Sequence, residues 1–445
     1  MSDNGTSTFI RKATSVGAIN IADRLAAAGL GIFLARTLAP EGYGTYAFVM
    51  AQVTLVALFA KLGLPELILR DYAANRGNGW RKAPARLLRT AITLSSSSSL
   101  ILIIIGTVLL TTVYDGPSRG EFMLGLVMIA PMAFFEIYAG ALRGLGYVVT
   151  FQFVSTLGMT LLILLGCLGY FFAFHDFSAF DALTVRIGIL CALSALVVHM
   201  VNKATRVQFG AAFADEKSKR PSSRDTLSTS LSFLVIGVLH VVFVTIDQLM
   251  LGYMVGESSV ATFRVAAEGA QIVAFAYVAG NAVLAPEYSR IFSSGNLTLL
   301  EQTARQSAAI VLVIALPLFL ALVLFANPIV TFAFGEAYDG AARPLSILAV
   351  GHFLALLFGD PLYVLNMTGH HKRSMQLTIL AVAVNIVLNA LAIPQFGVVG
   401  AAMATTFSFV MLRFLAYFYV RLHLGIECSA ISGLNQIRKM GINRG

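Results

Sequence analysis

Residues 14–48 carry the sequence TSVGAINIADRLAAAGLGIFLARTLAPEGYGTYAF, and this stretch decides the fold. Its first part, 14–36, is apolar and long enough to cross a bilayer, which takes ~20 residues. Asp23 and Arg24 nevertheless lie near its midpoint. Burying a charge at the centre of a bilayer costs ~2.5–3.5 kcal/mol or more, so such residues usually face a helical bundle or a watery cavity. The stretch therefore predicts a membrane helix that borders a hydrated cavity.

A polar stripe runs along this expected helix. Asn20, Arg24, Ala27 and Gly31 recur at i, i+4, i+7 and i+11, which places them on one face. A guanidinium suits the geometry of phosphate, so we predict that Arg24, with Asn20 beside it, binds an anionic headgroup. The alternative is an ion pair between Arg24 and Asp23, although adjacent helical residues point about 100° apart. Asp23 is also a candidate for ion coupling.

The composition indicates a polytopic membrane protein. Hydrophobic residues make up 58% of the 445 residues and charged residues 12%, against about 25% charged in soluble domains. The formal charge of +9 comes from short loops between apolar spans, so we expect no nucleic-acid partner. Three widely spaced cysteines predict neither a disulfide framework nor a zinc site. No P-loop or HExxH motif occurs, so we expect neither an enzyme nor a bound cofactor.

Apolar segments of bilayer length recur along the whole chain. We predict an all-α protein of about twelve transmembrane helices, at roughly 14–36, 43–64, 87–112, 120–142, 150–172, 180–203, 227–253, 261–285, 306–333, 342–366, 373–393 and 398–420.

The longest polar interruption divides these spans into six and six. We predict an N-lobe over 1–203, a cytoplasmic linker over 204–226, a C-lobe over 227–423 and a cytoplasmic tail over 424–445. An offset of 217 residues aligns 34–46 with 251–263 as a weak internal repeat. Repeated halves that rock about a central cavity are a common design of transporters.

The distribution of arginine and lysine predicts the orientation in the membrane. With the amino terminus inside, 23 of the 31 basic residues fall in cytoplasmic segments and only Arg36, Arg119 and Arg343 lie clearly outside. Cytoplasmic loops are enriched in such residues, so we expect both termini in the cytoplasm. Residues 1–13 are polar and the first span lacks a cleavage pattern, so we expect it to act as an uncleaved anchor. The other five basic residues lie within spans: Arg24, Lys61, Arg186, Arg264 and Arg413.

The second half of the chain has its own charged stripes. His240 and Asp247 lie seven residues apart on one face, and such a pair can carry a proton. A structural hydrogen-bonding role for Asp247 is an equal alternative. Arg264 and Glu268 lie at i and i+4, where they either neutralise each other or serve substrate binding and ion coupling. Lys61 either contacts substrate or extends its amine to the cytoplasmic interface.

One further feature predicts a local break in a span. Asp360 precedes Pro361 inside the expected span 342–366. Proline cannot continue a helix from the preceding turn, so we expect a hinge there, with partners for the freed backbone groups.

Three motifs resemble one family. LGIFLARTLAPEGYGTYAF (30–48), FANPIVTFAFGEAYDGAARPLSIL (325–348) and IPQFGVVGAAMAT (393–405) occur in order. They are similar to turns of bacterial lipid-linked oligosaccharide flippases, the polysaccharide transporter branch of the multidrug/oligosaccharidyl-lipid/polysaccharide exporter superfamily. The resemblance extends over most of 9–423.

The resemblance implies the function. Its cargo would be a polyprenyl-pyrophosphate-linked oligosaccharide, an O-antigen or exopolysaccharide repeat unit, moved across the bacterial cytoplasmic (inner) membrane by alternating access. Polysaccharide polymerase and glycosyltransferases would be partners beside the lipid bilayer. Three alternatives stay open: a multidrug/cation antiporter, a flippase for the peptidoglycan lipid precursor, and a non-transporting scaffold of a glycan synthesis complex.

The predicted topology is testable with single cysteines. Cysteines placed near Asp215 and Asn435 should react with an impermeant reagent only from the cytoplasm, and one near Asp339 only from outside, because the basic loops stay inside. Labelling of the Asp215 and Asp339 sites from the same face would contradict this orientation.

Overall fold

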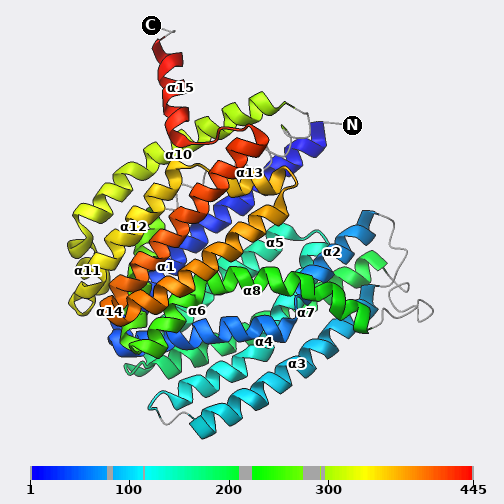
Figure 1. Cartoon of the computed structure of the whole chain (residues 1–445). Coiled ribbons are helices and arrows are strands. Elements are labelled where there is room, and N and C mark those ends of the chain that lie inside the picture. The colour runs from blue at the N-terminus through cyan, green and yellow to red at the C-terminus, as the bar shows by residue number, and fades with distance from the viewer. Residues whose placement is uncertain are drawn as a thin grey trace. The chain divides into compact units, whose positions relative to one another are not determined.

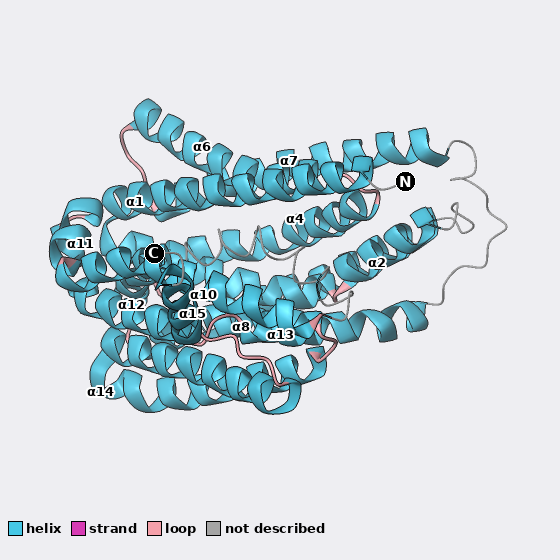
Figure 2. Ribbon diagram, turned by 90° about the horizontal axis from the view of Figure 1, so that it is seen from above, coloured by secondary structure: helices cyan, strands magenta, loops and turns pink. Residues whose placement is uncertain are grey.

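The protein is almost entirely helical. The computed structural model describes residues 3–77, 84–113, 116–209, 223–273, 291 and 296–442. No strand occurs within these residues, and Figure 2 shows helices joined by short loops. The all-α prediction is therefore confirmed. Most of the expected linker and the latter half of the expected span 261–285 lie outside the described residues.

The helices follow the predicted spans closely. Their bounds are α1 (Asp3–Lys61), α2 (Leu64–Gly77), α3 (Pro84–Val113), α4 (Arg119–Gly144), α5 (Val148–Gln152), α6 (Met159–Phe174), α7 (Ala179–Phe209), α8 (Ser223–Met254), a helix over 257–273, α10 (Leu297–Leu324), α11 (Ala326–Phe334), α12 (Ala342–Leu357), α13 (Pro361–Met367), α14 (His371–Tyr419) and α15 (Ala430–Ile442). Among the described residues, nine helical stretches are long and apolar enough to cross a membrane. Two of these, in α1 and α14, each contain two predicted spans separated by a kink.

The kink of α1 follows from one proline. Ala39 has a non-helical backbone (φ 54°, ψ 173°) directly before Pro40. Proline has no N–H and disfavours helical geometry in the residue before it. The Ala35 carbonyl, in the turn before the kink, accepts a hydrogen bond from the buried Tyr338 hydroxyl at 3.1 Å. This bond ties the kink of α1 to the segment that follows α11.

The predicted span 306–333 is displaced in the structure. α10 begins earlier, where the Asn296 side chain accepts a hydrogen bond from the N–H of Leu299 at 2.9 Å as an N-cap. It ends at Leu324, and the separate α11 starts at Ala326 with Pro328 in its first turn, where proline is tolerated.

The break predicted at Asp360 is confirmed. α12 ends at Leu357 and α13 starts at Pro361. The Asp360 carboxylate caps α13 by accepting from the N–H of Tyr363 at 3.3 Å, and it also accepts from Arg413 Nη1 at 2.7 Å. A buried ion pair therefore holds the start of α13.

Contacts within the chain define two compact units. Unit 1 comprises Met1–Ile21, Gly31–Gly44 and Ile246–Gly445, and unit 2 comprises Ala22–Leu30 and Thr45–Thr245. In unit 2, α4 packs against α2, α3 and α7, and in unit 1, α12 packs against α10 and α14 (Figure 1). The lobe boundary expected within 204–226 stays a prediction.

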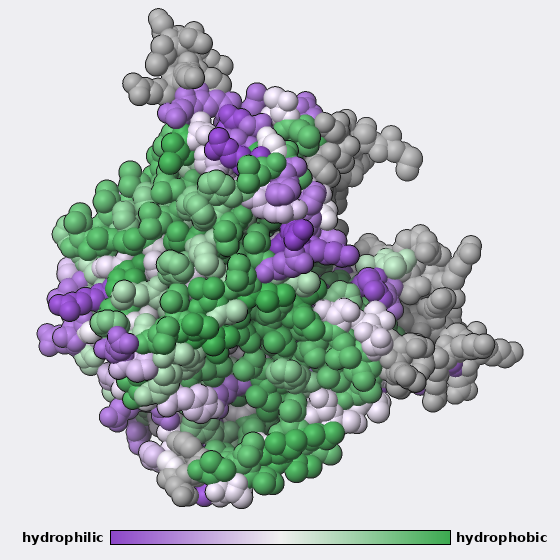
Figure 3. Space-filling model, viewed as in Figure 1, coloured by the Kyte–Doolittle hydropathy of each residue, from purple (hydrophilic) through white to green (hydrophobic). Residues whose placement is uncertain are grey.

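The outward faces of the helices are apolar. On α3 the exposed residues include Leu100, Ile101, Ile104, Ile105 and Val108. Figure 3 shows hydrophobic side chains over much of the visible face. Large apolar patches of this kind suit a hydrocarbon solvent and not water.

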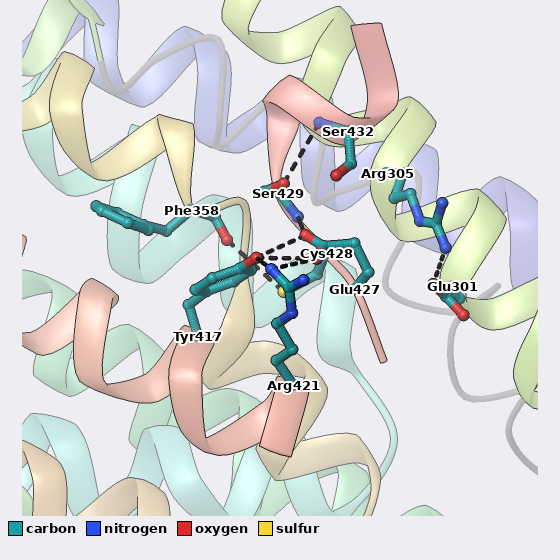
Figure 4. Close-up of polar contacts among 9 residues, drawn as sticks. All are labelled: Glu301, Arg305, Phe358, Tyr417, Arg421, Glu427, Cys428, Ser429 and Ser432. Carbon is teal, nitrogen blue, oxygen red and sulfur yellow. Dashed lines mark hydrogen bonds and ion pairs between the residues drawn. The ribbon is translucent and has the colours of Figure 1, made fainter. Parts of the chain in front are cut away.

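The carboxyl-terminal segment folds back onto unit 1. We call residues 425–442 the C-terminal strap (Figure 4). Both carboxylate oxygens of Glu427 lie 2.9 Å from the Tyr417 hydroxyl, and Arg421 Nη1 lies 3.1 Å from Oε2. The N–H of Ser429 donates to the same carboxylate at 3.1 Å. Burial raises the pKa of Glu427, but these hydrogen bonds and the charge of Arg421 outweigh burial and lower it.

The strap packs closely against two membrane helices and the α12–α13 break. Cys428 is buried and its thiol lies 3.6 Å from the Phe358 carbonyl oxygen. Gly359 (φ 69°) lies so close that a Cβ would come within 2.0 Å of the Cys428 carbonyl oxygen. α15 packs on α10, where a Cβ on Gly433 would meet the Arg305 carbonyl oxygen at 2.0 Å. The strap therefore covers the break in the tenth predicted span.

The contacts of Glu427 with Tyr417, Arg421 and Ser429 should control access to the Cys428 thiol. In a C191S background, Glu427→Ala should raise the labelling rate of Cys428 by a water-soluble maleimide roughly tenfold or more, because hydrogen bonds to charged groups contribute about 1.5–3 kcal/mol. Glu301→Ala, which removes the acid of the nearby Glu301–Arg305 pair on α10, is the matched control and should leave the rate unchanged. Equal labelling of Glu427→Ala and the parent would show that other contacts hold the strap.

Candidate functional site

The polar stripe of α1 lies on a continuous helix, as the sequence predicts. Arg24 is exposed, and Asn20 and Asp23 are half-buried. The Asp23 carboxylate accepts a hydrogen bond from the Thr160 hydroxyl of α6 at 2.7 Å. The acid is therefore directed toward α6, while its basic neighbour is exposed on a different face of α1.

Lys61 lies within unit 2 and forms an ion pair with Glu136 of α4. Glu136 in turn lines a cavity of about 420 Å³ between α4, the α5–α6 segment and α7. At one end of the lining, Arg143 pairs with Glu66 at 2.9 Å. Lys61 therefore has a carboxylate partner beside this cavity.

Arg186 of α7 also lines this cavity, and the sequence analysis gave it no role. Its Nη1 donates a hydrogen bond to the Tyr46 hydroxyl at 2.7 Å. A basic residue within a predicted span was the available signal. Its tyrosine partner lies 140 residues away and could not be read from local sequence.

Asp247 sits in a buried polar cluster of unit 1. Its carboxylate is 2% exposed and accepts hydrogen bonds from Asn389 Nδ2 at 2.6 Å and Asn385 Nδ2 at 3.3 Å. Asn389 Nδ2 also donates to Asn385 Oδ1 at 3.1 Å, while the buried Asn389 Oδ1 has no hydrogen-bond partner among the residues that the structure describes. Carboxylate and amide oxygens are ligands for hard cations. The cluster is thus able to hold a proton or a small cation.

His240 is seven residues before Asp247 on α8 but has a different environment. His240 is exposed, whereas Asp247 is buried. His240 belongs to unit 2, whereas Asp247 belongs to unit 1. Their expected cooperation stays a prediction.

Arg264 and Glu268 form the predicted pair, on the helix over 257–273. Arg264 Nε lies 2.9 Å from Glu268 Oε1 and 3.2 Å from the Tyr43 hydroxyl, which itself donates to Glu268 Oε1 at 3.2 Å. Among the described residues, the buried Glu268 Oε2 has no hydrogen-bond partner. A Cβ at Gly31 would approach that oxygen to 2.1 Å, so a larger residue there would require the Glu268 side chain to move.

Two asparagines of the Asp247 cluster were missed by the sequence analysis. Asn385 and Asn389 are one helical turn apart in the apolar run NIVLN, and both are buried. Two amides at this spacing within a span were the available signal, since polar side chains within the membrane need partners. Which acid they meet depends on the packing of α14 against α8.

Solved structures share this fold. An inward-facing multidrug resistance MATE family transporter of the MOP superfamily matches with a TM-score of 0.69 at 16% identity, covering 94% of this chain and 98% of that chain. The lipid II flippase MurJ in an inward closed conformation matches with a TM-score of 0.67 at 13% identity, covering 96% of this chain and 92% of that chain. At these identities the likeness establishes the fold alone. It confirms the expectation of about twelve helices in two lobes.

The chain is also similar in sequence to a curated protein named as a flippase. The probable low-salt glycan biosynthesis flippase Agl15 of Haloferax volcanii is 26% identical over 215 residues, which is 47% of this chain and 45% of that protein. The chain matches less than half the length of its curated relatives.

Family models match most of the chain. The MatE model matches residues 229–391. The model of the polysaccharide biosynthesis protein family matches residues 9–292, which is more than half of the chain. The chain therefore belongs to the polysaccharide biosynthesis protein family, within the superfamily that its three motifs resemble.

Proposed function

We propose that the protein is a flippase that moves a polyprenyl-pyrophosphate-linked oligosaccharide from the inner to the outer leaflet of the cytoplasmic membrane for polysaccharide biosynthesis. Family membership supports this proposal. The curated relative named as a glycan flippase and the fold shared with a lipid II flippase support it further. Sugars and pyrophosphate cannot cross hydrocarbon unaided, because removing water from polar and charged groups is too costly.

The observation that carries the proposal is the position of Arg24. It is exposed near the middle of the first predicted span, and its acidic neighbour Asp23 is hydrogen-bonded to Thr160 of α6. A guanidinium at this depth offers charge-assisted hydrogen bonds to a pyrophosphate. The lipid tail stays in the bilayer while the headgroup passes through a hydrated path by alternating access.

The Asp247 cluster is the proposed coupling site of this flippase. Asp247 can exchange a proton or a sodium ion while Asn385 and Asn389 hold its carboxylate. Occupancy would change the charge of a buried group in unit 1, and such a change shifts a conformational equilibrium when the two states differ in affinity for the ion. An ion gradient could then drive the cycle.

A multidrug/cation antiporter is the second candidate. It is favoured by the MatE match over residues 229–391 and by the buried acid Asp247 in that region. The exposed Arg24 at mid-span opposes it, because a cationic residue repels cationic cargo. Accumulation of a lipophilic cation in proteoliposomes, without flipping of a lipid-linked sugar, would favour the antiporter.

Substitution of Arg24 tests the proposed function. With purified protein in liposomes and a fluorescent lipid-pyrophosphate sugar, Arg24→Ala should lower the affinity for cargo roughly ten- to a hundredfold, because a charge-assisted contact is lost. Arg24→Lys should keep part of the flipping activity, since the charge remains while the planar fork is lost. Arg36→Ala is the matched control, because Arg36 bonds the Ala333 carbonyl oxygen and has no proposed cargo contact.

Two outcomes would contradict the role of Arg24. The first is that Arg24→Ala flips cargo as fast as the parent at subsaturating cargo and equal amounts of folded protein. Arg24 would then not bind the cargo. Rescue of Arg24→Ala by an added Asp23→Asn would instead assign Arg24 to charge balance with Asp23.

Coupling is tested separately. Asp247→Asn should abolish the dependence of flipping on a pH or sodium gradient while leaving protein abundance near that of the parent, because the amide cannot ionise yet fills the same space. His240→Ala should change the pH dependence if the two residues act together. Asp176→Asn, at an exposed position between α6 and α7, is the control. Unchanged gradient dependence in Asp247→Asn would make the cluster structural.

A further inference from the structure

The cavity of unit 2 is lined along much of α4. Its lining on α4 includes Met128, Met132, Glu136 and Arg143, which recur on one face over 15 residues. At ~1.5 Å rise per residue this face extends for about 22 Å. Its volume of about 420 Å³ falls within the usual ~300–1,000 Å³ of small-molecule sites. The cavity is therefore able to hold an extended small molecule.

Charge within this cavity is balanced everywhere except at Arg186. Arg143 pairs with Glu66, and Glu136 pairs with Lys61. The Arg186 guanidinium donates to the neutral hydroxyl of Tyr46 at 2.7 Å. Among the charged residues that line the cavity, Arg186 alone is without a described carboxylate contact. A guanidinium in such a place favours an anion, since the surrounding low dielectric strengthens the attraction.

The remainder of the lining is mostly apolar, with Ser155 and Thr156 as its uncharged polar residues. Met50, Met128, Met132 and Met159 belong to three different helical segments, and Leu190 lies one turn beyond Arg186 on α7. Unbranched thioether side chains adjust to ligands of varied shape. Methionine-rich walls next to one cationic end match a molecule with a charged head and a flexible apolar chain.

We propose that this cavity binds an anionic amphiphile, with the phosphate or carboxylate at Arg186 and the apolar chain along the methionine side chains of α4 and α6. The site consists only of unit 2 residues and does not include Arg24 or the Asp247 cluster. It therefore stands or falls independently of the proposed flippase activity. The anionic group can come from a membrane lipid or from a lipid-linked cargo, and the chemistry that Arg186 recognises is the same.

Direct binding to the purified full-length protein tests the site. The probes are dodecyl phosphate, dodecyltrimethylammonium with the same chain and opposite charge, and inorganic phosphate without a chain, each titrated in a neutral detergent. Dodecyl phosphate should bind best. Arg186→Gln should weaken its binding roughly tenfold or more, and Arg186→Lys should restore part of it. Arg206→Gln, at an exposed position on the same helix, is the matched control and should bind as the parent does.

A second variant tests the cavity without changing any charge. Met132→Trp should fill the space along α4 and weaken dodecyl phosphate binding even if Arg186→Gln fails to fold. Tyr46→Phe removes only the phenol and should retain binding if Arg186 contacts the ligand directly. Equal binding of dodecyl phosphate to the parent, Arg186→Gln and Met132→Trp would overturn the proposal, as would equal affinity for the cationic probe. If inorganic phosphate bound as tightly as dodecyl phosphate, the proposed contact between the apolar chain and the methionine side chains would be wrong.

Discussion

The need to pair every backbone polar group within the bilayer is the constraint on which the rest of this structure depends. Within a regular helix the backbone N–H and C=O groups bond to each other. Where a helix breaks, some of these groups lose their partners and need new ones. At the kink of α1, Tyr338 donates to the Ala35 carbonyl, and Arg36 Nε donates to the Ala333 carbonyl at the end of α11 at 2.9 Å. Two of the recognisable motifs, 30–48 and 325–348, thus meet in unit 1 and are joined by hydrogen bonds in both directions.

Buried charged side chains also need hydrogen-bond partners, and leaving one without a partner costs more free energy than leaving a backbone group without one. Asp360 caps α13 and pairs with Arg413, and Asp247 is held by two amides. An isolated buried charge costs far more than a buried dipole, so each acid is surrounded by donors. The first network holds the start of a helix. In the second, the Asn389 amide oxygen has no hydrogen-bond partner within the part of the chain that the structure describes.

The cationic residues within the spans divide into two kinds. Lys61, Arg264 and Arg413 form ion pairs with carboxylates of their own unit, and such pairs stabilise position with little net charge. Arg186 instead contacts a phenol at the edge of a methionine-lined cavity. Counting charges along the chain cannot separate these kinds. The i,i+4 spacing indicated the partner of Arg264, but the partners of Lys61, Arg413 and Arg186 lie far along the chain and only tertiary packing shows them.

The sequence by itself determined the membrane class, the helix positions and the family, because hydrophobic length, basic loops and proline-glycine breaks act over short distances along the chain. It predicted the break at Pro361 and two separate spans at 14–36 and 43–64 for the same reason, whereas the structure showed one long helix kinked at Ala39. The sequence could not find the Asn385 and Asn389 partners of Asp247, the tyrosine at Arg186 or the contact between Cys428 of the strap and Phe358. These contacts join residues 70 to 142 positions apart. Tertiary packing decided them, since it alone sets which faces of distant helices meet.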